Sequence, residues 1–75
     1  MKLSNITFLE EKNNDHIVLN LISGTEDIKN FFVTSGSIEI DKIIDIQNFS
    51  YKIDEFKFEL VDEEFLNLDL YLSKI

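Results

Sequence analysis

Hydrophobic and polar residues alternate most regularly in the C-terminal third of the chain, in two runs at residues 56–60 and 66–72. Alternation with a period of two is typical of a strand that buries one face. We expect that face of both strands to lie in a core. It is formed by Phe56, Phe58, Leu60, Leu66, Leu68, Leu70 and Leu72. The opposite face is polar, and an acidic turn at residues 62–64 separates the two runs.

The N-terminal part of the chain repeats this alternation less strictly. Residues 2–10 and 16–22 are two predicted strands, and the polar cluster at 11–15 is typical of a turn between them. The sequence therefore predicts a first hairpin. The apolar side chains expected to share one face within each strand are Ile6 and Phe8, then Ile17, Leu19 and Leu21.

The segment after this hairpin combines a short helical signal with strand signals. Residues 25–30 predict one helical turn, with Thr25 as the N-cap and acidic residues in the first turn. Residues 31–34 are aromatic and β-branched, which favours a strand. The glycine-containing pair at 35–36 then predicts a hairpin that leads into residues 37–40.

Residues 37–46 fit two periods. The side chains that share strand parity are Ile38, Ile40, Ile44 and Ile46, and those that fit helical spacing are Ile40, Ile43 and Ile44. β-Branched residues favour the strand, and a helix across 39–48 is the alternative.

The alternation resumes at Phe49, Tyr51 and Ile53, but the apolar parity shifts by one residue before Phe56. A one-residue slip would place the following side chains on the wrong face of the sheet. The shift therefore predicts a tight turn or a bulge at residues 54–55.

These segments predict a single domain over residues 1–75, with a radius of gyration of roughly 11 Å. The fold class is all-β: a small antiparallel meander that forms a bent sheet or a barrel, with one short helix near 25–30 as an option. The alternative is an α+β fold that contains the 39–48 helix.

The composition narrows the functional classes. The net charge is −8, with seven lysines, and arginine and cysteine are absent. The absence of cysteine excludes disulfides and thiolate zinc sites and favours a cytoplasmic location. The negative charge disfavours direct binding to nucleic acid or to an anionic membrane, and it favours a basic protein partner.

The side chains available for chemistry form no recognisable catalytic, cofactor-binding or metal-binding motif. His16 is the only histidine, and we expect it at the surface or at a sheet edge. The acidic clusters lack the spacing of a calcium loop, and Gly24 and Gly36 are isolated, unlike the glycines of a phosphate loop. We therefore expect a protein that is not an enzyme and that needs no cofactor or metal.

The acidic residues are concentrated at positions 54–69, which contain seven carboxylates and one lysine and therefore have a net charge of −6. Alternate side chains on a strand are about 6.6–6.8 Å apart, which is close to two phosphate steps along a DNA strand. Tyr71 lies on the outward parity and is suited to an interface. The predicted partner-binding residues are Asp54, Glu55, Glu59, Asp62, Glu63, Glu64, Asp69 and Tyr71.

In size and charge, the whole chain resembles the small phage-encoded anti-defence proteins, which include anti-CRISPR proteins and anti-restriction DNA mimics. The resemblance is one of composition. It implies a non-enzymatic inhibitor that acts in a bacterial host on a nucleic-acid-handling enzyme, such as a Cas effector or another nuclease. Two other functions are open: an immunity protein or antitoxin with a cognate toxin, and an accessory subunit that pairs through a sheet edge, especially at residues 66–75.

Overall fold

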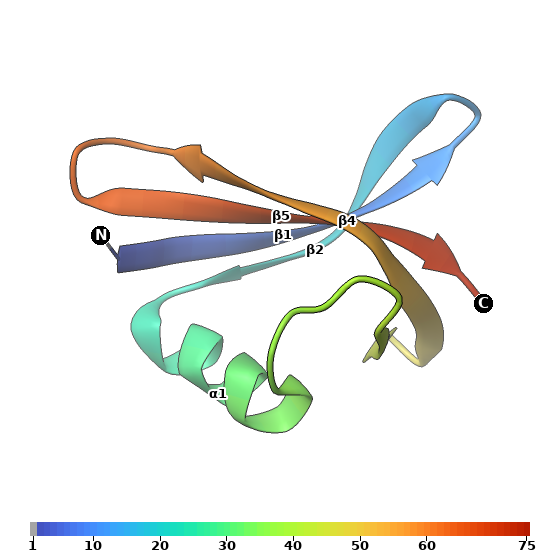
Figure 1. Ribbon diagram of the computed structural model, residues 1–75, viewed down its shortest axis with the longest axis horizontal. Helices are drawn as coiled ribbons and strands as arrows, with labels where there is room; N and C mark the ends of the chain where they lie inside the picture. The colour runs from blue at the N-terminus through green and yellow to red at the C-terminus, as the bar shows by residue number, and fades with distance from the viewer. Residues whose placement is uncertain (1) are drawn as a thin grey trace.

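Within residues 2–75, which the computed structural model describes, the chain forms a five-stranded curled sheet and one helix (Figure 1). The elements are β1 (Lys2–Lys12), β2 (Asp15–Ser23), α1 (Thr25–Ser35), β3 (Ile43–Ile46), β4 (Phe49–Leu60) and β5 (Phe65–Lys74). The predicted all-β class, with a bent sheet and one short helix, is confirmed. The radius of gyration is 12.1 Å, slightly above the expected value.

The strand order is β2-β1-β5-β4-β3, in which β1 and β5 are parallel and the other neighbours are antiparallel. The prediction of a continuous meander is therefore wrong, because the chain crosses from the β2 edge of the sheet to the β3 edge. Parallel neighbours need such a long crossover, and here it includes α1. The suggested pairing edge at residues 66–75 is also wrong, since β5 is the central strand and has a partner on both sides.

Register shifts in three strands help to curl the sheet. Single extra residues interrupt the pairing at Ser4 in β1, Leu19 in β2 and Asp54 in β4. Bulges of this kind bend a strand and increase its twist. The bulge predicted at residues 54–55 is confirmed, and the one at Ser4 brings Leu3 to the face that carries Ile6.

Both short hairpin turns contain two consecutive residues with positive φ, the signature of a type I′ turn. These are Asn13 and Asn14 between β1 and β2, and Gln47 and Asn48 between β3 and β4. The first confirms the predicted polar turn at 11–15. The Gln47 side chain also donates a hydrogen bond of 3.2 Å to the carbonyl oxygen of Leu19. This bond links the two edges of the sheet, which forms a half-barrel.

The core lies on the concave face of the sheet. Its most deeply buried members are Ile6, Phe8, Ile53, Leu68, Leu70 and Leu72, and Ile28, Ile44, Ile46 and Tyr51 complete it. Ile6 and Phe8 confirm the predicted inward face of the first strand, and Leu68, Leu70 and Leu72 confirm that of the last.

Helix α1 is longer than the single turn predicted at 25–30. It continues through residues 31–34, so the strand and hairpin predicted there are wrong. Ile28, Phe31 and Phe32 contact the core at the helical spacing i, i+3, i+4, whereas Val33 points outward and is 77% exposed. The predicted Thr25 cap is also wrong, because Gly24 occupies the N-cap position and no side chain caps the helix.

Helix α1 ends at Gly36, whose φ of 75° and ψ of −150° define a conformation that is essentially restricted to glycine. Residues 36–42 then form an irregular connection, so the strand predicted at 37–40 and the alternative helix at 39–48 are both wrong. Asp41 has a positive φ of 70°, which interrupts the extended run. Its backbone N–H donates to Ile53 and fixes the connection to β4 (2.8 Å).

Replacing Lys42 by methionine is expected to lower the free energy of unfolding by about 1–2 kcal/mol. Lys42 is half-buried, and its Nζ donates to the carbonyl oxygens of Ser35 and Ser37 at the end of α1. Cations stabilise this end of a helix. Urea denaturation measures the loss. Lys29→Met, at an exposed position of α1, is the matched control, and equal losses in both variants would contradict the capping role.

Candidate functional site

The strongest concentration of charge lies on the hairpin of β4 and β5. We call residues 54–69 the β4–β5 arm, which carries a net charge of −6 out of −8 for the chain. Figure 1 shows its turn at the opposite end of the molecule from the β1–β2 turn. The backbone N–H of Lys2 donates to the carbonyl oxygen of Glu64 and fixes the N-terminal strand beside the turn (2.8 Å).

The turn of the arm presents three acidic side chains, and one of them also holds the backbone. Asp62 Oδ1 accepts hydrogen bonds from the N–H groups of Glu64 (2.8 Å) and Phe65 (3.1 Å). Glu63 and Glu64 are exposed. The ion pairs among residues 2–75 involve none of these three carboxylates. The predicted acidic turn is therefore present as an ordered, uncompensated group of charges.

Replacing Asp62 by alanine is expected to lower the free energy of unfolding by about 1 kcal/mol, because two backbone N–H groups lose their acceptor. Asp62→Asn keeps an acceptor oxygen and is the matched variant. It is expected to retain most of the stability while it removes one charge. Thermal unfolding of both variants measures the difference. Equal destabilisation would show that charge, and not hydrogen bonding, stabilises the turn.

Glu55 and Glu59 lie along the outer side of β4, but they do not form a continuous acidic row. Lys57 lies between them in the alternation, and its Nζ is 3.9 Å from Glu55 Oε1. A cation therefore interrupts the phosphate-like spacing. The negative charge of the arm is concentrated at its turn and at Glu59, which is exposed and outside the ion pairs of the described chain.

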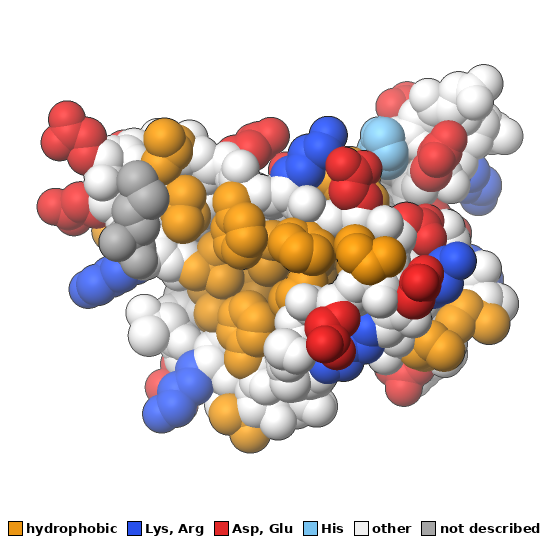
Figure 2. Space-filling model, viewed as in Figure 1, with side chains coloured by type: hydrophobic (Ala, Val, Ile, Leu, Met, Phe, Trp, Pro, Cys, Tyr) orange, Lys and Arg blue, Asp and Glu red, His pale blue; other side chains and the backbone are white. Residues whose placement is uncertain are grey.

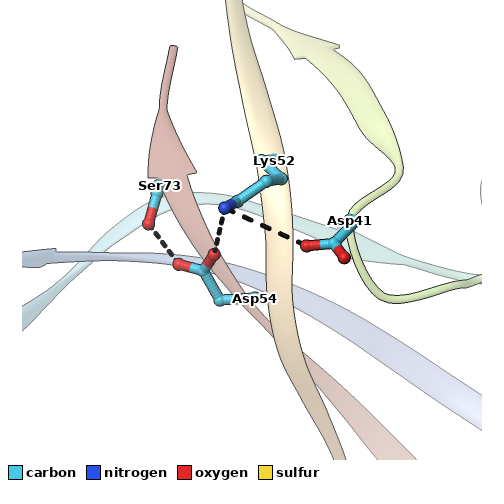
Figure 3. A network of polar contacts seen from close by, with 4 residues as sticks. All are labelled: Asp41, Lys52, Asp54 and Ser73. Atoms are coloured by element: carbon cyan, nitrogen blue, oxygen red, sulfur yellow. Dashed lines mark hydrogen bonds and ion pairs between the residues drawn. The ribbon is translucent and has the colours of Figure 1, made fainter.

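Asp54 belongs to a polar network at the bulge of β4 (Figure 3). Its carboxylate accepts a hydrogen bond from the Ser73 hydroxyl and lies 3.7 Å from Lys52 Nζ. Lys52 is also 3.9 Å from Asp41, so the network connects β4 with the irregular segment before β3 and with β5. Exposed pairs of this kind contribute little free energy each. Asp54 is thus engaged within the molecule.

Asp69 is the least accessible of the predicted partner-binding residues. It is 8% exposed, and its carboxylate accepts a hydrogen bond of 2.7 Å from the Asn67 side-chain amide. Its cross-strand neighbours are Thr7 on β1 and Lys57 on β4, and they lie on either side of Asp69 on the outer face of the sheet. Asp69 therefore adds to the charge of the arm without presenting an exposed carboxylate.

Tyr71 is half-buried on the same outer face. Its ring makes an edge-to-face contact with exposed His16 at a centroid distance of 5.1 Å, and Lys57 Nζ lies 5.4 Å from its centroid. These three side chains, together with those of Glu11 and Glu55, line a small pocket of about 180 Å³. The predicted surface position of His16 is confirmed, and Tyr71 adds a partly accessible aromatic ring beside the arm.

A second, larger depression lies between α1 and the strands β2 and β3. It has a volume of about 570 Å³, is open to solvent, and is lined by polar side chains such as Asp27, Asn30 and Gln47 together with Phe31. Residues 2–75 contain no group of three or more acidic or histidine side chains placed to hold a metal ion. The depression between α1, β2 and β3 therefore has no cluster of charged side chains comparable with that of the β4–β5 arm.

The sequence pattern missed an apolar surface on the arm. Phe58 and Leu60 face the same side as Leu68 and Leu66, as expected, but they are 57% and 66% exposed. The prediction that they lie in the core is therefore wrong. Helix α1 packs over β1 and β2 and leaves this end of β4 uncovered. The alternation of residues 56–60 gives the face of each side chain, but it contains no signal for what covers that face.

A comparison with protein-family models, curated proteins and solved structures returns no match for the chain. Within the described residues, α1 is too short and too polar to cross a membrane. The β4–β5 arm is therefore the feature of this chain from which a function is proposed.

Proposed function

We propose that this chain is a non-enzymatic inhibitor that binds a basic, nucleic-acid-binding surface of a host defence nuclease through its β4–β5 arm. The observation that carries the proposal is the uncompensated charge at the turn of the arm. Asp62, Glu63 and Glu64 are exposed side by side, outside every ion pair of the described chain.

The architecture supports this use of the arm. The central strand β5 is paired along both sides, and its C-terminal half, with Leu68, Leu70 and Leu72, is buried in the core. The hairpin is therefore held in place by the sheet. Preorganised surfaces lose less conformational entropy on binding. Asp62 fixes the turn with its own carboxylate, so the acidic group is ordered before it meets a partner.

Charge also gives the interaction a measurable signature. Complementary potentials accelerate encounter and make binding strongly dependent on salt. A site that normally binds nucleic acid supplies the required lysine and arginine side chains.

The chain itself is expected not to bind duplex DNA, because its net charge is −8. Fluorescence anisotropy with a labelled duplex measures this directly.

The proposal is tested by capture from a bacterial lysate on the immobilised chain, followed by mass spectrometry. The Debye length falls from about 10 Å at 0.1 M salt to about 3 Å at 1 M salt. We expect a nuclease or another nucleic-acid-binding enzyme to be retained at about 0.1 M and released at about 1 M. Its activity is then assayed with and without the chain. A captured enzyme that stays fully active in a saturated complex would overturn the proposal.

A further inference from the structure

Leu3, Phe56, Phe58, Leu60 and Leu66 form what we call the open apolar face. Leu60 on β4 pairs with Leu66 on β5, which in turn pairs with Leu3 on β1. Directly opposed residues of neighbouring strands present their side chains on the same side. The rings of Phe56 and Phe58 are in edge-to-face contact with a centroid distance of 6.2 Å. The face is therefore continuous across three strands.

Helix α1 covers only part of the sheet. Strands lie about 4.8 Å apart and a helix with its side chains is about 10 Å across, so one helix covers about two strands. Helix α1 packs over β1 and β2 and leaves the end of β4 uncovered, together with the start of β5 at the half-buried Leu66. Figure 2 shows hydrophobic side chains gathered at the centre of this side of the molecule. A second helix would complete the layer.

The charge around the open apolar face defines the chemistry of that helix. Asp62, Glu63 and Glu64 lie in the turn next to Leu60. In Figure 2, acidic side chains lie at the left end of the apolar area and, with basic side chains among them, along its upper rim. Lysine or arginine residues that flank an apolar stripe would meet these carboxylates. A second copy of this chain would instead bring two arms together, each with a net charge of −6, which is repulsive.

We propose that the open apolar face binds an amphipathic helix of the partner protein, with leucine-like residues on one side and lysine or arginine residues beside them. The inference rests on the proposed function, because it states how the same arm holds its cationic partner. Apolar burial then supplies the affinity, and the acidic turn supplies orientation and speed of association.

The probe is a synthetic leucine–lysine peptide with its leucines at positions i, i+3, i+4 and i+7, and binding is followed by fluorescence anisotropy. We expect Phe58→Ser/Leu60→Ser to weaken binding by at least about tenfold. Val33→Ser, which changes an exposed residue on the outer side of α1, is the control and should bind normally. Circular dichroism verifies that the variants are folded. A double variant that is folded and binds normally would show attraction by charge alone and overturn the inference.

Two further measurements fix the position and the nature of the occupant. Methyl resonances of Leu3, Leu60 and Leu66 should shift on addition of the peptide, and shifts confined to the β1–β2 hairpin would overturn the inference. A leucine–glutamate peptide should not bind. Sedimentation equilibrium tests whether a second copy of the chain occupies the face. A dimer that the Phe58→Ser/Leu60→Ser substitutions disrupt would assign the face to self-association and overturn the proposal.

The peptide assay tests the inference and the lysate capture tests the proposed function, so a negative result in one is distinguishable from a negative result in the other. Binding of the peptide without capture of a nucleic-acid-handling enzyme would support the open apolar face as a helix-binding site and remove the proposed function. Capture of such an enzyme by a chain that does not bind the peptide would leave the proposed function intact and overturn the inference.

Discussion

Replacement of Leu70 by alanine is expected to lower the free energy of unfolding by about 2–5 kcal/mol. Leu70 is fully buried on the central strand, between Phe8 of β1 and Phe56 of β4. Truncation removes apolar contacts and leaves a cavity, because well-packed neighbours relax only in part. A domain of this size has little stability to spare, so the variant is expected to be largely unfolded at moderate urea concentrations.

Leu60→Ala is the matched substitution on the same face of the sheet. Leu60 is 66% exposed, so its truncation is expected to change the free energy of unfolding by less than about 1 kcal/mol. Urea denaturation monitored by tyrosine fluorescence or circular dichroism measures both variants. Equal losses would contradict the structure, because they would mean that the end of β4 is covered in the folded protein.

Reversal of two charges at the turn, in Glu63→Lys/Glu64→Lys, is expected to weaken binding to the captured enzyme by at least about 30-fold, or about 2 kcal/mol. Both residues are exposed and make no hydrogen bond with their side chains in the described chain, so folding should be unaffected. Two lysines facing a cationic surface replace attraction with repulsion. Surface plasmon resonance should show most of the loss in the association rate at low salt.

Glu11→Lys/Glu39→Lys is the control for this reversal. It changes the net charge by the same amount, from −8 to −4, at two exposed positions outside the β4–β5 arm. Its effect on binding should be several-fold smaller than that of the turn variant. Equal losses from the two variants would mean that total charge, and not the arm, determines the interaction.

The local sequence pattern predicted those features of the fold that depend only on neighbours in sequence. The bulge near Asp54 and the buried face of β5 follow from the parity of apolar residues, and the hairpin turn at 11–15 follows from its cluster of polar residues. The position of β5 between β1 and β4 did not follow, since parity does not identify the partner of a strand. The parallel pair of β1 and β5 joins the two ends of the sequence.

Helix α1 shows where local preference misleads. Residues 31–34 are aromatic and β-branched, which favours a strand. In the structure, Ile28, Phe31 and Phe32 face the core together at helical spacing, and this tertiary packing outweighs the intrinsic preference. The same spacing is present in the sequence, but a glycine at position 36 is compatible with a hairpin as well as with the end of a helix, and in the structure Gly36 is the C-cap of α1.

The predicted partner-binding residues have unequal environments. The charge count gave the location of the arm, and Glu59, Glu63 and Glu64 are exposed as expected. It did not distinguish these from Asp69, which is buried on the outer face, or Asp54, which belongs to a network with Lys52 and Ser73. Such differences depend on cross-strand neighbours, and a sequence pattern without strand order does not contain them.

The central claim is that the arm occupies the surface on which a partner binds nucleic acid. It is tested most directly by competition: the captured enzyme is held on the immobilised chain, and its cognate nucleic acid is added at constant ionic strength. We predict that added nucleic acid displaces the enzyme from the immobilised wild-type chain, and that nucleic acids with higher affinity for the enzyme displace it at lower concentrations. A ternary complex, in which enzyme, chain and nucleic acid remain bound together without loss of affinity, would contradict this account.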